Sequence, residues 1–159
     1  MFNYYMKHIR FDDPFKKKNI YNREIYDICN QYLYIEQLYH NEEFENKPII
    51  LKHLKTKYNS YKYQDKLKKK FDQDKYIGFE ELIYKLYESK LKCYYCKNQL
   101  FLMYDHKKCN EQWSLERLNN NLGHYDNNTC ISCLKCNLQR RNDNHEYFKF
   151  SKQLTIKKI

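Results

Sequence analysis

The 159-residue chain has no alanine, no valine, and only two glycines and two prolines. The residues in excess have A/T-rich codons, so nucleotide composition is the first explanation for the 18 tyrosines, and we do not interpret each as a base-stacking position. The chain also lacks an uninterrupted apolar run of the roughly 18 residues that a membrane span needs. Because Ile, Leu, Tyr and Phe nevertheless recur throughout, the composition predicts a folded chain and not a disordered one.

The sequence also lacks the features of a secretory signal peptide. The first residues, MFNYYMKHIR, lack the apolar core of a signal peptide. We therefore expect an intracellular protein, in the cytoplasm or nucleus, that is not secreted and does not bind a membrane. In a reducing compartment its seven cysteines are expected to be metal ligands and spare thiols, not disulfides.

Thirty Lys and Arg against twenty Asp and Glu give a formal charge of +10. This excess suits a polyanionic partner such as nucleic acid, although solubility alone explains it equally well. The length fits one domain, or a small domain with an N-terminal extension.

Helical spacing of apolar residues predicts an α-helical, lysine-rich N-terminal extension, residues 1–90, before a C-terminal module, residues 91–159. Helices are expected over residues 20–39, 48–71 and 79–90, after a loosely held arm at 1–19. Pro48 lies at the start of the second of these segments, and proline is favoured in the first turn of a helix. The lysines of 48–71 can follow a phosphate backbone, but a solvated face is the more common explanation of such a run.

Two Cys-x2-Cys pairs, CYYC (93–96) and CLKC (133–136), carry the strongest chemical signal. Two such turns can complete a closed tetrahedral zinc site, so we expect Cys93, Cys96, Cys133 and Cys136 to bind a structural Zn2+. A zinc with four thiolate ligands has no open position for water and is not a catalyst.

Cys130 leaves an alternative, because CISCLKC also permits its pairing with Cys133. If residues 128–132 are extended, Cys130 lies before the turn, which favours the first assignment. Cys29 and Cys109 have no partner at ligand spacing and are expected to be spare thiols.

Between the pairs, strands are expected over residues 99–104, 112–118 and 128–132, with a polar loop over 118–128. A helix should begin at Asn137, and a last helix should cover 144–154. The predicted fold class is therefore α+β.

The stretches CYYC, WSLERLNNNLGH and NTCISCLKCNLQRR resemble the HNH (ββα-metal) endonucleases with a four-cysteine zinc clip, including the HNH proteins of large DNA viruses. The specific match covers residues 93–141. The resemblance implies a small zinc-stabilised ββα-metal module. It also implies that Glu116 and Asn137 bind a catalytic Mg2+ or Mn2+, and that Asn128 pins the loop between the strands.

The sequence departs from the HNH pattern at Arg117, where the family has its base histidine. A guanidinium stays protonated and cannot act as a general base, although it can hold a phosphate. His124 is the natural replacement, because imidazole accepts a proton near pH 7. His106, beside Asp105, is the second candidate.

Metal-dependent cleavage of DNA is therefore the expected activity, with Arg140 and Arg141 contacting phosphates and no small-molecule cofactor. The alternative is a catalytically inactive, zinc-containing protein that binds nucleic acid on an HNH scaffold, for which Arg117 is the best support. A zinc-stabilised protein-interaction domain is a third alternative, but it leaves the charge and the arginine pair unexplained.

Overall fold

The computed structural model describes residues 23–106 and 108–155, which form a mixed α+β fold. The described part contains the α-helices α1 (Ile28–Tyr39), α2 (Lys47–Leu67), α3 (Phe79–Glu88), α4 (Leu134–Arg140) and α5 (His145–Gln153). Its strands are β1 (Trp113–Arg117) and β2 (Thr129–Cys133), and its short 3-10 helices are η1 (Arg23–Tyr26) and η2 (Asp126–Asn128). The arm predicted at 1–19 lies outside the described residues.

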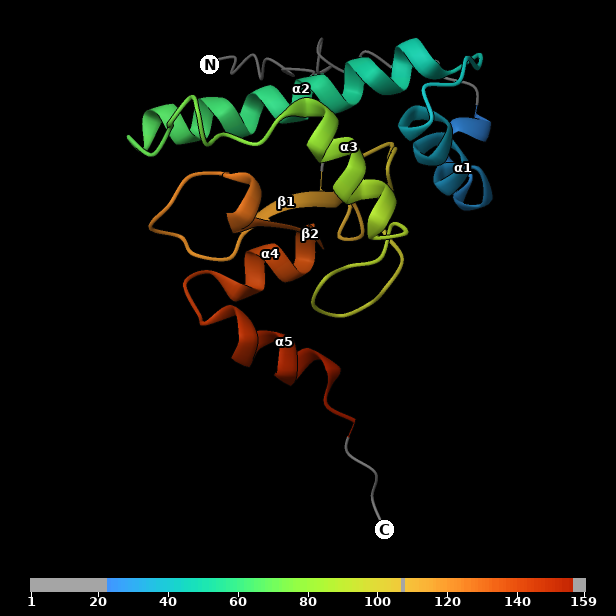
Figure 1. The fold of residues 1–159 in the computed structure, drawn as a ribbon. Helices are drawn as coiled ribbons and strands as arrows, with labels where there is room; N and C mark the ends of the chain where they lie inside the picture. The colour runs from blue at the N-terminus through green and yellow to red at the C-terminus, as the bar shows by residue number, and fades with distance from the viewer. Residues whose placement is uncertain (1–22, 107, 156–159) are drawn as a thin grey trace, which may run out of the picture.

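The sheet lies between the long helix α2 and the helix α4 (Figure 1). β1 and β2 pair antiparallel, with Trp113 opposite Cys133 and Glu116 opposite Cys130. α1 packs against α3, which runs from the level of α2 towards the sheet, and α5 extends away beyond α4 (Figure 1). This arrangement gives β1 neighbours in both halves of the chain.

Helix α2 begins as expected, with proline in its first turn, but ends at Leu67 instead of the predicted residue 71. The cause is local: Lys69 adopts a left-handed backbone with φ of 55°, which ends a helix. The amide of Lys70 then donates to the Asp65 carbonyl over 2.8 Å, closing the last turn. Helix α1 is also shorter than predicted, because the Asp27 carboxylate caps it at the amide of Cys29.

The strand predicted over residues 99–104 is wrong, since this segment makes only isolated bridges in the described structure. A side chain replaces the strand partner. The Gln31 side-chain oxygen accepts hydrogen bonds from the amides of Leu102 and Met103, and its Nε2 donates to the Met103 carbonyl over 3.1 Å. Leu102 and Met103 remain buried, so the apolar run is used for packing without forming a ladder.

Helix α4 begins three residues before the predicted start at Asn137. Cys133 is its N-cap, and the Sγ of Cys133 accepts the amide of Cys136 over 3.3 Å. The cysteine turn is therefore itself the first turn of the helix. Helices α3 and α5 lie within two residues of their predicted limits.

The core crosses the predicted boundary between extension and module. Buried Ile35, Leu54 and Leu86, from α1, α2 and α3, belong to one apolar cluster with Trp113 of β1 and Ile131 of β2. The division at residue 90 stays a prediction. Among the described helices, none combines the length and the apolar character needed to cross a membrane.

Candidate functional site

The four predicted zinc ligands lie together. The Sγ atoms of Cys93, Cys96, Cys133 and Cys136 are all within 4.8 Å of one another. Tetrahedral zinc with bonds of about 2.3 Å separates its sulfur ligands by about 3.8 Å, and the Cys96 and Cys133 sulfurs are 4.0 Å apart. The cluster can therefore hold a metal ion such as zinc.

Within this cluster the thiolate is favoured at Cys93, whereas hydrogen bonds to the Cys93 sulfur raise the pKa of Cys133 and of Cys136. The Sγ of Cys93 accepts the amide of Cys133 over 3.2 Å. Hydrogen bonds from Cys133 and Cys136 lower the pKa of Cys93, and the deprotonated form is the one that binds metal. Cys130 does not belong to this group of described residues, and burial raises the pKa of its thiol to about 12.

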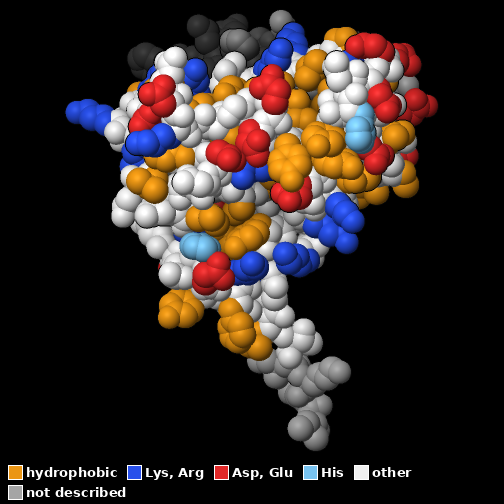
Figure 2. Space-filling view, viewed as in Figure 1, with side chains coloured by type: hydrophobic (Ala, Val, Ile, Leu, Met, Phe, Trp, Pro, Cys, Tyr) orange, Lys and Arg blue, Asp and Glu red, His pale blue; other side chains and the backbone are white. Residues whose placement is uncertain are grey.

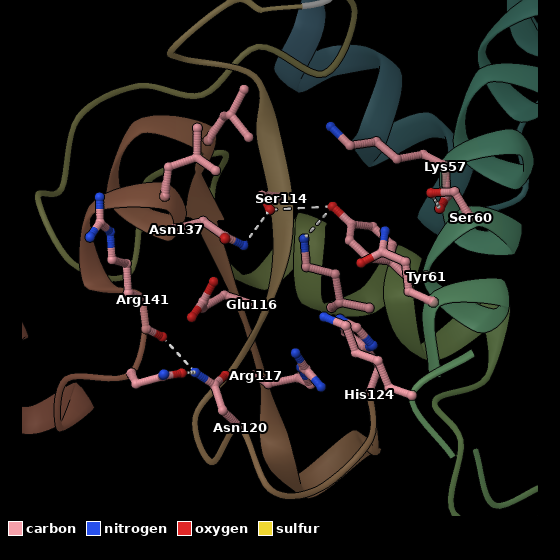
Figure 3. Close-up of a pocket in the computed structure, with 16 residues that line it drawn as sticks. Lys57, Ser60, Tyr61, Ser114, Glu116, Arg117, Asn120, His124, Asn137 and Arg141 are labelled. Atoms are coloured by element: carbon pink, nitrogen blue, oxygen red, sulfur yellow. Dashed lines mark hydrogen bonds between the residues drawn. The ribbon is translucent and has the colours of Figure 1, made fainter. Parts of the chain in front are cut away.

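A cavity of about 540 Å³ opens beside β1, between α2 and α4 (Figure 3). Its lining includes Glu116 and Arg117 of β1, His124 of the following loop, Asn137 of α4, and Arg141. Five of the predicted site residues are thus brought to one cavity.

Glu116 is buried and paired with Arg140, which is 2% exposed. The Arg140 Nε donates to Glu116 Oε1 over 2.6 Å, and its Nη2 contacts the same oxygen. Burial raises the pKa of Glu116, and the charge of Arg140 offsets part of this rise. Both contacts are made by Oε1, so Oε2 is the oxygen left to face the cavity.

Other N–H groups of Arg140 are also occupied. They bond the carbonyls of Asp143 and Arg117, over 2.8 and 2.6 Å, and the Asn120 side chain over 3.1 Å. This burial and these partners disfavour a contact between Arg140 and a DNA phosphate, although Arg140 does line a second cavity. The phosphate contact at Arg140 stays a prediction, whereas Arg141 is exposed at the cavity beside β1.

Asn137 is oriented by its neighbours. Its Nδ2 donates to Ser114 Oγ over 2.8 Å, and Ser114 Oγ lies 3.3 Å from the Tyr61 hydroxyl of α2 (Figure 3). With the amide nitrogen held in this way, the amide oxygen is the end available to a cation.

Asn128 is buried and holds the loop between the strands. Its Oδ1 accepts the Asn119 amide over 2.9 Å, and its Nδ2 donates to the carbonyls of Asn119 and Gly123 over 3.0 and 2.9 Å. From the end of the loop it contacts backbone near the start and in the middle of the loop, and it does not line the cavity. This geometry makes it a positioning residue for the loop that carries His124.

His124 is 3% exposed and contacts a carboxylate that the sequence did not single out. Its Nδ1 lies 2.9 Å from Asp65 Oδ1, and its amide donates to Asp65 Oδ2 over 2.6 Å. Burial lowers the pKa of His124, although Asp65 partly opposes this. A neutral imidazole whose other nitrogen faces the cavity is the form that can accept a proton.

Arg117 lies between these groups. Its Nη1 donates to the Leu122 carbonyl over 3.3 Å and lies 3.9 Å from Asp65 Oδ1. His106, the second candidate base, is exposed, pairs with Asp105 over 2.7 Å and does not line the cavity.

Helix α2 contributes site residues that sequence reasoning missed. Lys57, Tyr61 and Asp65 recur every four residues, the spacing of one helix face. Lys57 Nζ bonds Gln112 Oε1 over 2.9 Å and lies 4.5 Å from the centre of the Trp113 ring, and burial lowers its pKa to about 7. The four-residue spacing of these three residues could have identified them, but the many lysines of the same helix made a solvated face the more common explanation.

Comparison with protein-family models, curated proteins and solved structures finds no match to this chain. The assignment of a function therefore depends on the residues at the cavity and on the cysteine cluster beside it.

Proposed function

We propose that this chain is a metal-dependent HNH-type endonuclease that hydrolyses phosphodiester bonds in DNA. One observation carries the proposal: Glu116, His124 and Asn137, from a strand, a loop and a helix, line one cavity. The helix that supplies Asn137 begins at the four-cysteine cluster. Zn2+ held by these four cysteines would fix α4, and through it Asn137, relative to β1.

The oxygen donors at the cavity suit a hard cation. Glu116 Oε2 and the Asn137 amide oxygen are the ligand types that Mg2+ and Mn2+ prefer. A buried carboxylate whose pKa is raised by burial is also stabilised by a nearby cation. Two protein ligands leave positions for water and phosphate oxygens, as in many Mg2+ sites.

A bound divalent ion would supply electrostatic stabilisation of the charge that develops on the phosphate and on the leaving oxygen. The residues of the chain have separate roles. His124 accepts the proton of the attacking water at Nε2. The Arg117 guanidinium, which cannot serve as a base, contacts a phosphate oxygen and stabilises its charge.

We expect DNA binding to depend on the charge around the cavity. On the side seen in Figure 2, Lys and Arg are interspersed with Asp and Glu. The cavity lining contains one acidic residue, Glu116, and four basic residues: Lys57, Lys68, Arg117 and Arg141. Contacts from such residues go to phosphates, so we expect salt-sensitive binding with little sequence preference.

A catalytically inactive nucleic-acid-binding protein on the same scaffold is the second candidate. The Glu116–Arg140 ion pair favours it, because a carboxylate already neutralised by arginine binds a cation less strongly. His124 and its carboxylate partner favour the nuclease, because binding alone needs neither.

Nicking of supercoiled plasmid by the zinc-loaded protein distinguishes the two. Wild type should cleave with Mg2+ or Mn2+ and not with EDTA, and Glu116→Gln, which keeps the shape of the side chain and an oxygen for Arg140, should lose cleavage while retaining its zinc. Glu45→Gln is the matched control, since Glu45 is exposed between α1 and α2. Wild-type protein that binds DNA but cleaves no DNA form with any divalent ion would leave the binding protein as the function.

A further inference from the structure

We propose that Asp65 of α2 is the positioning residue of His124, holding the imidazole with its proton on Nδ1 and its bare Nε2 towards the cavity. The kinetic part of this inference rests on the proposed nuclease function; the structural part does not. Helix α2 would then belong to the active site instead of serving only as a basic extension.

The Asp65 carboxylate makes two contacts with the same residue. Oδ1 lies 2.9 Å from His124 Nδ1, and Oδ2 accepts the His124 amide over 2.6 Å. Asp65 is 0% exposed and does not line the cavity, so it can act on a substrate only through His124. The two contacts fix the ring and its backbone together.

The loop is built for this close approach. A Cβ on Gly123 would lie 2.4 Å from the Lys70 carbonyl and 2.9 Å from Asp65 Oδ2. Both neighbours belong to the end of α2 or the turn after it, and the Lys70 carbonyl is backbone that cannot rotate away. Only glycine lets residue 124 reach the carboxylate with its amide and its ring at once.

The surroundings favour a charged carboxylate and a neutral ring. Burial raises the pKa of Asp65, but hydrogen bonds from His124 and the charge of Arg117 bring it below its usual value. Burial lowers the pKa of His124, helped by the charges of Arg117 and Lys68. The Tyr61 ring, 4.9 Å from the imidazole, is the remaining close neighbour on α2. A neutral ring carries one N–H, and the carboxylate next to Nδ1 decides where it is.

An amide at position 65 cannot replace the carboxylate. His124 offers two donors to residue 65, its amide and Nδ1–H, and Asn has only one acceptor oxygen. The backbone amide is always a donor and takes that oxygen, so the Asn NH2 group faces Nδ1. The imidazole must then accept at Nδ1 and carry its proton on Nε2, the atom that should take the proton of water.

The kinetic test compares Asp65→Asn with wild type in plasmid nicking, with Asp74→Asn as the matched control on an exposed aspartate. We expect kcat to fall by a factor on the order of 10² to 10⁴, as for loss of a general base, with KM changed by less than about threefold. Asp74→Asn should behave as wild type. Cleavage by Asp65→Asn at the wild-type rate overturns the proposal.

A second measurement is independent of cleavage. The nitrogen-15 chemical shifts of the imidazole, assigned by their loss in His124→Ala, report which nitrogen carries the proton at neutral pH. Wild type should be protonated at Nδ1 and Asp65→Asn at Nε2. If wild type never cleaves DNA, the nuclease proposal fails and this result alone decides the positioning role. If Asp65→Asn does not fold, the wild-type spectrum decides it, and a proton on Nε2 overturns the inference.

Discussion

Replacing Arg140 and Arg141 one at a time tests whether the two arginines have different roles, one in stability and the other at the cavity. Arg140 is buried and makes an ion pair with Glu116, whereas its neighbour Arg141 is exposed at the cavity. Arg140→Ala should therefore lower stability, and Arg141→Ala should leave stability unchanged within about 0.5 kcal/mol, as is usual for surface substitutions.

The magnitude follows from what Arg140 leaves behind. Its removal leaves the Glu116 carboxylate, which is 4% exposed, without its hydrogen-bonded ion-pair partner. Breaking a buried pair from one side costs about 3–5 kcal/mol. The carbonyl of Arg117 also loses the hydrogen bond that Arg140 donates to it. The carbonyl of Asp143 loses one too, but Asp143 is exposed and can accept a hydrogen bond from water instead. In a chain of this length, each kcal/mol lowers Tm by about 2–4 °C, so a decrease of roughly 6–20 °C is expected.

Thermal and urea unfolding of the zinc-loaded variants checks this, with Glu116→Gln as the second arm of a double-mutant cycle. If the cost arises from a stranded charge, adding Glu116→Gln to Arg140→Ala should restore part of the lost stability. The reasoning is refuted if Arg140→Ala is as stable as Arg141→Ala, or if Glu116→Gln makes Arg140→Ala still less stable.

Three further predictions follow from the site. The chain should bind one Zn2+, and Cys96→Ser should unfold the region around α4, since structural zinc contributes on the order of 10 kcal/mol in small sites; a folded, metal-free wild type on elemental analysis would contradict this. Arg141→Ala should weaken DNA binding on all sequences and reduce the log–log salt slope by about one unit; an unchanged slope in titrations at several salt concentrations would show that Arg141 does not contact phosphate. Because the base is the neutral form and burial lowers the pKa of His124, wild-type cleavage should rise with pH through a midpoint below 6.5. His124→Ala should lose this rise and a factor of about 10² to 10⁴ in rate.

The metal cluster was the feature that the sequence predicted best. Ligand spacing is a local property: each Cys-x2-Cys turn brings two sulfurs together whatever the rest of the chain does. The spacing alone left Cys130 open as an alternative to Cys136. The start of α4 at the turn after Cys133 resolves it, because that turn points Cys136 and not Cys130 at the cluster.

The wrong prediction of a strand at residues 99–104 shows what a local sequence pattern does not contain. An apolar run indicates burial, but it does not say what satisfies the backbone. Here the Gln31 side chain supplies both donor and acceptor, from about 70 residues earlier in the chain. No periodicity within the segment contains that information.

The inward face of α2 was missed for a related reason. Periodicity analysis looks for apolar residues at helical spacing, but the half-buried Lys57 and the buried Tyr61 and Asp65 are polar, and each is withdrawn from solvent only because it has a specific partner. Burying a polar group without a partner costs about 1–3 kcal/mol, so such residues stay inside only when both sides of the contact are present. The partners Gln112, Ser114 and His124 are all in the second half of the chain. A polar residue on a lysine-rich helix is therefore indistinguishable from a solvated one until the helix is placed against β1. That placement changes the interpretation of α2 from a basic surface to the support of the cavity.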